Sequence, residues 1–281
     1  MTGITARHIL ITGASSGLGA ALARHYARPG VSLLLIARNA ERLDAVADEC
    51  RAGGAHVATA MVDVRDSLAL ASLIAEVDAR APIDTVVANA GVEASLGRVG
   101  EAEPLHDVLA QIRTNFEGAV ATVLPLLDSM RARGTGRIVL VSSLAGRMPL
   151  PDQPTYSATK AALIAFGEAL RPVLAARGVH LTLAIPGFIA TGMGHEYSGW
   201  RPFQWTAARA AAAIAAAADR GARSIAFPLP LVLLIGLGRC VPAFLREGVM
   251  RLFFGVHIGG VQRTCPEPVT GPAAEECGLS V

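Results

Sequence analysis

The chain has 281 residues, of which 52% are hydrophobic and 17% are charged, and its formal net charge is +2. This composition excludes a disordered or strongly acidic chain, and the balanced charge gives no reason to expect nucleic acid as a partner. The length predicts one large α/β domain with a sizeable core. The mean hydropathy of +0.44 is high for a water-soluble enzyme, which indicates that some segments carry an excess of apolar residues.

Short apolar runs alternate with longer helical patterns along most of the chain. The predicted strands are His8–Thr12, Val31–Ala37, Val57–Asp63, Ile83–Ala88, Arg137–Ser143, Val179–Ile185 and Ser224–Phe227, and the predicted helices are Leu18–Ala27, Glu41–Arg51, Ser67–Arg80, Leu105–Arg133, Ser157–Ala176 and Ala207–Arg220. The runs are continuous rather than alternating in polarity, which indicates strands buried on both faces. We therefore predict an α/β fold with a doubly wound, Rossmann-like parallel sheet of about seven strands and helices on both faces.

The first predicted strand runs directly into Gly13-Ala14-Ser15-Ser16-Gly17-Leu18-Gly19, and a helix follows at once. This stretch matches the G-x-S-x-G turn of a hydrolase serine, and it also matches a glycine-rich loop whose amides approach a pyrophosphate. A hydrolase serine needs an acid and a later histidine, and no late histidine here follows a convincing acidic partner. Gly19 has no role in a hydrolase turn but allows close packing of helix on strand. We therefore interpret the loop as a dinucleotide phosphate site.

The second predicted strand ends at Ala37, and Arg38 follows it. An acidic residue at this place would accept hydrogen bonds from a ribose 2′-hydroxyl, as NAD binding prefers. Arg38 instead offers a guanidinium that can pair with a 2′-phosphate, although a solvated arginine at a helix start would look the same. The position therefore favours NADP(H) over NAD(H).

Tyr156 and Lys160 are four residues apart, a spacing that places both side chains on one face of a helix. A nearby ammonium stabilises a phenolate, so the pair makes an adjustable acid/base, whereas the alternative is an amphipathic helix with an exposed lysine. Ser142 and Ser143 end the fifth predicted strand, at the sheet edge where a ligand crevice forms. Together these groups suit hydride transfer between a dinucleotide and a carbonyl group.

Over about residues 5–227 the chain resembles the short-chain dehydrogenase/reductase family. The matching residues are Thr12–Gly19, Asp63, Asn89-Ala90-Gly91, Asn115, Ser143, Tyr156, Lys160 and Pro186–Thr191. The resemblance implies that Tyr156 is the acid/base, and that Lys160 lowers its pKa and holds the nicotinamide ribose. It also implies that Ser143, rather than Ser142, positions the substrate oxygen and that Asn115 anchors a water of the proton relay.

The resemblance further implies a set of cofactor contacts. They fall on Gly13, Ser15, Ser16, Gly17, Leu18 and Gly19 in the first loop, on Asp63 and Val64 beside the adenine, on Asn89, Ala90 and Gly91 along the cofactor floor, and on Pro186, Gly187, Ile189 and Thr191 beside the nicotinamide, in addition to Arg38, Tyr156 and Lys160. From the residues alone, Asn115 would equally be a helix-interior asparagine bonded to backbone, and Asp63 a helix N-cap. Asn89-Ala90-Gly91 would equally be an ordinary turn at a strand end.

The expected activity is that of an oxidoreductase which transfers a hydride between NADP(H) and the alcohol or carbonyl group of a small or lipophilic substrate. A non-catalytic dinucleotide sensor or scaffold of the same fold is the alternative, although a sensor has no need for Ser143, Tyr156 and Lys160 together. A sugar epimerase or dehydratase is a second alternative, but residues 228–281 scarcely provide its substrate domain. A hydrolase that uses Ser15 is a remote third.

We expect residues 1–227 to form the dinucleotide-binding and catalytic domain and residues 228–281 to form a hydrophobic C-terminal extension with a polar tail. Residues 228–261 contain apolar segments with interspersed arginines. Such segments are compatible with peripheral membrane contact, with a lipophilic substrate channel, and with packing within the molecule or across a dimer. Ser224–Gly238 is too short and interrupted to span a membrane, and no secretory signal is evident, so we expect a cytoplasmic protein. The four cysteines lack metal-ligand spacing, so no metal is expected, and the family suggests a homodimer or homotetramer.

Overall fold

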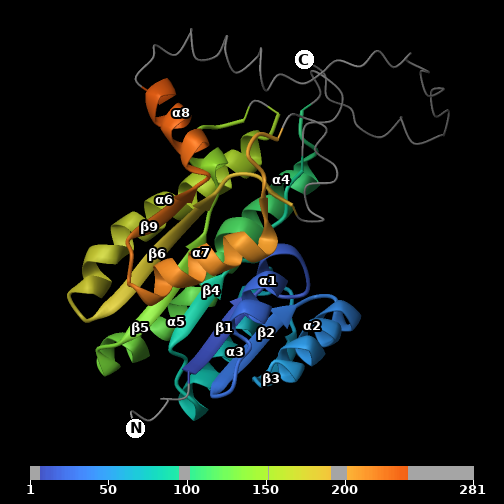
Figure 1. Cartoon of the computed structure of the whole chain (residues 1–281), viewed down its shortest axis with the longest axis vertical. Helices are drawn as coiled ribbons and strands as arrows, with labels where there is room; N and C mark the ends of the chain where they lie inside the picture. Colours follow the sequence, from blue (N-terminus) through green and yellow to red (C-terminus); the bar gives the residue numbers. More distant parts are fainter. Residues whose placement is uncertain (1–6, 95–101, 151, 191–200, 240–281) are drawn as a thin grey trace, which may run out of the picture.

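The computed structural model describes residues 7–94, 102–150, 152–190 and 201–239 (Figure 1). Its strands are β1 (Arg7–Thr12), β2 (Val31–Ala37), β3 (His56–Met61), β4 (Thr85–Ala88), β5 (Gly136–Val141), β6 (Val179–Pro186), β7 (Ile189–Ala190), β8 (Trp205–Thr206) and β9 (Ser224–Phe227). Its helices are α1 (Gly17–Tyr26), α2 (Ala40–Ala52), α3 (Ser67–Arg80), α4 (Leu105–Ile112), α5 (Gly118–Arg133), α6 (Pro154–Ala175), α7 (Ala207–Asp219) and α8 (Leu229–Arg239). A π-helical turn, η1 (Arg113–Glu117), joins α4 to α5, and a 3-10 turn, η2 (Leu144–Gly146), follows β5.

Seven parallel strands form the central sheet, in the order β3-β2-β1-β4-β5-β6-β9. The predicted doubly wound, Rossmann-like sheet is therefore confirmed. β1 and β4 lie side by side although β2 and β3 come between them in the chain, so the direction of winding reverses at this pair. In open α/β sheets a ligand binds beyond the carboxyl ends of the strands at such a switch point.

Each central strand contributes side chains to two hydrophobic cores, one on each face of the sheet. Ile9 and Ile11 of β1 belong to the core formed with α1 and α7, whereas Leu10 belongs to the core formed with α3 and α5. These two pairs of helices cover opposite faces of the sheet (Figure 1). Successive residues of a strand point to opposite faces, which is why the apolar runs are continuous. The edge strand β3 differs, because all of its residues are exposed or half-buried. The predicted burial on both faces is wrong for this strand, which lies at the end of the described sheet and pairs there with β2.

The predicted helix Leu105–Arg133 is divided into α4, η1 and α5. A π-helical turn holds one more residue than a regular turn, so it rotates the side chains that precede it relative to those that follow. Apolar periodicity does not signal such a turn, so the sequence predicted one unbroken helix. The turn matters for function because it contains Asn115.

Two strands end earlier than predicted, β3 at Met61 and β5 at Val141. Asp63, Ser142 and Ser143 consequently lie in loops at the carboxyl edge of the sheet. The helix predicted from Ser157 already begins at Pro154, because proline is well accommodated in a first helical turn.

Helix α8 directly follows β9, and the sequence reasoning did not predict it. Its Leu231 and Ile235 are buried in the core on the α6 side of the sheet, whereas Leu229 and Leu233 are exposed. None of the described helices is both long and apolar enough to cross a membrane. Residues 240–281 of the predicted extension lie outside the described residues. The domain division at 228, the oligomeric state, the membrane contact and the cytoplasmic location stay predictions.

Candidate active site

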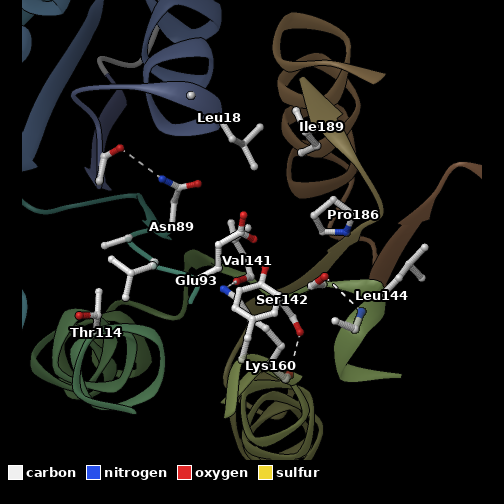
Figure 2. Close-up of a pocket in the computed structure, with 18 of the residues that line it drawn as sticks. Leu18, Asn89, Glu93, Thr114, Val141, Ser142, Leu144, Lys160, Pro186 and Ile189 are labelled. Atoms are coloured by element: carbon white, nitrogen blue, oxygen red, sulfur yellow. Dashed lines mark hydrogen bonds between the residues drawn. The ribbon is translucent and has the colours of Figure 1, made fainter. Parts of the chain in front are cut away.

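A cavity of about 1020 Å³ lies along the carboxyl edge of the sheet. It extends from the glycine-rich loop after β1, past the loops that follow β4 and β5, to α8. Figure 2 shows its middle, where Leu18 of α1, Asn89 after β4, Lys160 of α6 and Pro186 of β6 converge from four elements. The cavity thus occupies the place that the switch point between β1 and β4 predicts for a ligand.

Close packing explains the glycines of the first loop. Gly13 has a φ of +67°, and a Cβ atom on it would lie 2.8 Å from the Cα atom of Ala90. A Cβ atom on Gly19 would lie 2.2 Å from the carbonyl oxygen of Gly13, so neither position accommodates a side chain. The Asn89 Nδ2 atom donates hydrogen bonds to the carbonyl oxygens of Thr12 at 3.0 Å and Gly13 at 3.4 Å. These contacts hold the start of α1 open toward the cavity, as a phosphate requires.

Most of the predicted cofactor residues line this cavity. They are Gly13, Ser15, Ser16, Gly17, Leu18, Arg38, Asp63, Val64, Asn89, Ala90, Gly91, Tyr156, Lys160, Pro186, Gly187 and Ile189. Gly19 is not part of the lining and serves the packing of α1 against the loop. Thr191 lies outside the described residues.

The end of the cavity beside β2 and β3 is basic. Arg65 donates hydrogen bonds from Nε at 2.9 Å and from Nη2 at 2.6 Å to the Asp63 Oδ2 atom, and the Arg38 Nη1 atom lies 3.7 Å from the same oxygen. The hydrogen bond from Arg65 and the nearby Arg38 charge hold the pKa of Asp63 below its usual range. Asp66, not Asp63, caps α3 by accepting a hydrogen bond from the backbone N–H of Ala69, so the capping alternative for Asp63 is wrong.

Arg42 and Arg65 also line this basic end, and the sequence reasoning did not single them out. Arg42 lies in the first turn of α2, and its backbone N–H donates to the Asn39 Oδ1 atom at 2.8 Å. The spacing of Arg38 and Arg42 across this cap was an available signal. Arg65 reaches the same end only through the pairing of β2 with β3.

Tyr156, Lys160 and Ser143 meet in the middle of the cavity. The Lys160 Nζ atom lies 5.6 Å from the centre of the Tyr156 ring and donates a hydrogen bond to the Val141 carbonyl oxygen at 3.0 Å. Ser143 is hydrogen-bonded to Tyr156, and its Oγ atom also accepts from the backbone N–H of Ala145 at 3.1 Å. The Ser142 Oγ atom instead donates to the Lys160 carbonyl oxygen at 2.7 Å, which directs it into α6 (Figure 2).

Burial dominates the ionisation of the Tyr156–Lys160 pair. It raises the pKa of Tyr156 and lowers the pKa of Lys160 to about 8. The carboxylate of Glu93 raises the pKa of both groups, and the hydrogen bond with Ser143 lowers that of Tyr156. In this structure burial and the Glu93 charge raise that pKa, and the lowering by Lys160 that the resemblance implies stays a prediction. At neutral pH Tyr156 is a phenol, a proton donor.

Asn115 is fully buried in the π-helical turn. Its Oδ1 atom accepts a hydrogen bond from the backbone N–H of Val92 at 2.7 Å, and its Nδ2 atom donates to the Val92 carbonyl oxygen at 2.8 Å. Nδ2 also donates to the Thr159 Oγ1 atom at 3.1 Å. Asn115 thus bonds to backbone, as the sequence alternative allowed, but it joins the loop after β4 to the helix that carries Tyr156. Its water-anchoring role stays a prediction.

The end of the cavity opposite the arginines is mostly apolar. The residues that line it are Leu144, Met148, Leu150 and Phe188, together with Leu231, Leu234, Ile235, Leu237 and Gly238 of α8. The apolar run at the start of the extension was the available signal for α8. Among the described residues no cluster of histidine, cysteine and acidic side chains could hold a metal ion.

Comparison with known proteins decides the family. The family model for short chain dehydrogenases matches residues 7–202. The chain belongs to the short-chain dehydrogenase family. It is an NAD(P)-dependent oxidoreductase that acts on CH–OH or C=O groups, which confirms the family and the type of enzyme expected from the sequence.

Individual relatives agree with this assignment. An uncharacterized oxidoreductase of Myxococcus xanthus is 35% identical over 252 residues, which cover 89% of this chain and 99% of the relative. A short-chain dehydrogenase from Sphingobium yanoikuyae in complex with NADPH is 27% identical with a TM-score of 0.74, over 87% of this chain and 95% of that one. A short chain dehydrogenase from Mycobacterium paratuberculosis bound to NAD is 23% identical and shows the same fold, with a TM-score of 0.70 over 79% and 96% of the two chains.

Proposed function

We propose that this oxidoreductase transfers a hydride between NADP(H) and the alcohol or carbonyl group of a lipophilic substrate. The observation that carries the proposal is the order of side chains along one cavity. Three arginines line one end, the hydrogen-bonded Ser143 and Tyr156 lie with Lys160 in the middle, and leucines of α8 line the other end. A charged dinucleotide and an apolar substrate fit opposite ends of such a cavity and meet at the tyrosine.

The three polar side chains have separate tasks. In the reducing direction the cofactor supplies the hydride to the carbonyl carbon, and Tyr156 gives its hydroxyl proton to the carbonyl oxygen. Ser143 donates a hydrogen bond that holds this oxygen beside Tyr156. The Lys160 ammonium stabilises the phenolate left after the transfer, and its bond to the Val141 carbonyl oxygen fixes its place. In the oxidising direction the same proton returns to Tyr156.

The preference for NADP(H) is supported by the basic end of the cavity. A 2′-phosphate is recognised best by guanidinium groups, and Arg38, Arg42 and Arg65 all line this end. The carboxylate of Asp63 is paired with Arg65, so it does not oppose an anion as a free acidic group would. The NADPH complex of the Sphingobium yanoikuyae relative is consistent with this preference.

The lipophilic substrate is supported by the opposite end of the cavity. Met148, Leu150, Phe188, Leu234 and Leu237 line it, and apolar side chains recognise hydrocarbon. Leu234 and Leu237 are also 58% and 68% exposed, so a substrate chain would cover apolar surface that now faces solvent. Each buried methylene contributes about 0.8 kcal/mol, or roughly a fourfold gain in affinity.

A chain-length series tests this proposal. We expect kcat/KM with NADPH to rise by roughly threefold to fourfold per methylene across straight-chain aldehydes and ketones, until the apolar end is filled. Leu234→Gln should flatten the series. Leu229→Gln, an exposed leucine of the same helix that does not line the cavity, should leave it unchanged. A wild-type series without dependence on chain length would contradict the lipophilic substrate.

A further inference from the structure

One ionisable side chain in the middle of the cavity has no part in the reaction described so far. Glu93 lies two residues beyond Gly91, in the loop that follows β4, and it lines the cavity together with Tyr156 and Lys160. A Cβ atom on Gly91 would lie 3.4 Å from the Lys160 Nζ atom, so this loop runs directly past the ammonium group. Figure 2 shows Glu93 near Val141 and Lys160, within the catalytic part of the cavity.

Two buried amide side chains hold the backbone on both sides of Glu93. Asn115 binds the N–H and the carbonyl oxygen of Val92, at 2.7 and 2.8 Å. The Gln111 Oε1 atom accepts a hydrogen bond from the backbone N–H of Ala94 at 3.3 Å. Asn115 and Gln111 are 0% and 1% exposed, so both clamps are part of the protein interior. The backbone of Glu93 is therefore held in place on both sides beside the cavity.

We propose that Glu93 is a positioning residue of the active site, a fixed carboxylate that keeps Lys160 charged and Tyr156 protonated. A buried ammonium is costly without a counter-charge. The only hydrogen bond given by Lys160 Nζ among the described residues goes to the neutral carbonyl group of Val141. The influence of Glu93 on both ionisations agrees with this role, since its charge raises the pKa of Lys160 and of Tyr156.

The other charged side chains of the cavity lie elsewhere along it. They are Arg38, Arg42, Asp63 and Arg65 at the basic end and Arg201, which precedes β8. None of these five is among the groups that shift the pKa of Tyr156 or Lys160. Among the described residues, Glu93 is therefore the charged side chain that acts on both ionisations, in addition to the larger effect of burial.

The composition of the chain makes the proposal directly measurable. Lys160 is the single lysine among 281 residues, because every other basic side chain except histidine is arginine. Protein made with ¹³Cε-labelled lysine therefore gives one side-chain resonance, whose shift with pH reports the pKa of Lys160 without substrate or turnover. The measurement stays valid if the proposed substrate or cofactor preference is wrong, although the catalytic meaning of the result rests on the proposed reaction.

We expect Lys160 to titrate at lower pH in Glu93→Gln than in the wild type, since the ammonium loses its counter-charge. Glu93→Ala should shift the titration in the same direction, and it provides a second test if the glutamine variant folds poorly. Glu93→Asp should stay closer to the wild type. As a control, Glu168→Gln removes one carboxylate from the exposed face of α6, the helix that carries Lys160, and should leave the titration of Lys160 unchanged. Wild-type titration of Lys160 in both charge-removing variants would overturn the proposal.

The pH profile then separates this role from substrate recognition. Reduction needs the Tyr156 proton, and loss of the Glu93 charge lowers the pKa of Tyr156. The alkaline fall of kcat/KM for carbonyl reduction should therefore begin at lower pH in Glu93→Gln. A raised KM with an unmoved alkaline limb would instead mean that Glu93 binds the substrate, and it would contradict the positioning role.

Discussion

Ser142 and Ser143 are neighbours in the loop that follows β5, yet their side chains have different partners. The Ser142 hydroxyl group donates to the backbone of α6, whereas Ser143 is hydrogen-bonded to Tyr156. Spacing to Tyr156 predicted this choice of serine. No spacing rule predicted the ionisation of Tyr156 and Lys160, because it depends on burial and on Glu93, which only the fold brings to them.

Arg38 gives a prediction at the same scale. Arg38→Asp should weaken binding of NADPH by roughly tenfold or more, since it replaces a charge-assisted contact with repulsion, and it should weaken NADH binding much less. Fluorescence titration with both nucleotides measures this. Arg177→Asp makes the same charge change at an exposed position outside the cavity and serves as the control. Equal losses for NADPH and NADH in Arg38→Asp would argue against a contact with the 2′-phosphate.

Among the elements, the π-helical turn has the least sequence signal and a clear structural consequence. It inserts Asn115 between the loop after β4 and α6, so that one buried amide holds Val92 and reaches Thr159. The glycine-rich loop is the opposite case. Its glycines signal their own close contacts, and the structure finds Gly13 against Ala90 and Gly19 against Gly13. The glycine motif is thus itself a sequence signal, whereas the π-helical turn, which depends on contacts with the loop after β4 and with α6, has none.

The turn has a measurable stability effect. Asn115→Ala removes the partners of the Val92 N–H and carbonyl groups, and unpaired polar groups in the interior cost about 1–3 kcal/mol. We expect a loss of this size in the free energy of unfolding from urea denaturation. Ser129→Ala removes a side-chain bond to the Leu126 carbonyl oxygen within α5 and should change the stability by less than about 0.5 kcal/mol. An Asn115→Ala variant as stable as Ser129→Ala would rule out this clamp.

At the scale of the whole molecule, the order of the strands and their parallel direction place every proposed reacting group at the carboxyl edge of the sheet. The continuous apolar runs sufficed to predict the parallel sheet of seven strands, and most of the residues that the motifs predicted as cofactor contacts line one cavity. Arg65 and Glu93 were missed, because each reaches the cavity only through the strand pairing and loop packing of the fold, and the apolar run of α8 was noted without a choice among its possible roles. The excess hydropathy is partly explained by the central strands, buried on both faces, and partly by α8, which lines the proposed substrate end.

The central claim is that Tyr156 is the proton donor of a hydride-transfer enzyme. Tyr156→Phe keeps the ring and removes the hydroxyl group, so the most direct test is to measure NADPH binding and NADPH-dependent carbonyl reduction in the same variant. We expect binding to stay within a few-fold of the wild type and kcat to fall by roughly 10²–10⁴ or more. Turnover at the wild-type rate would contradict the account.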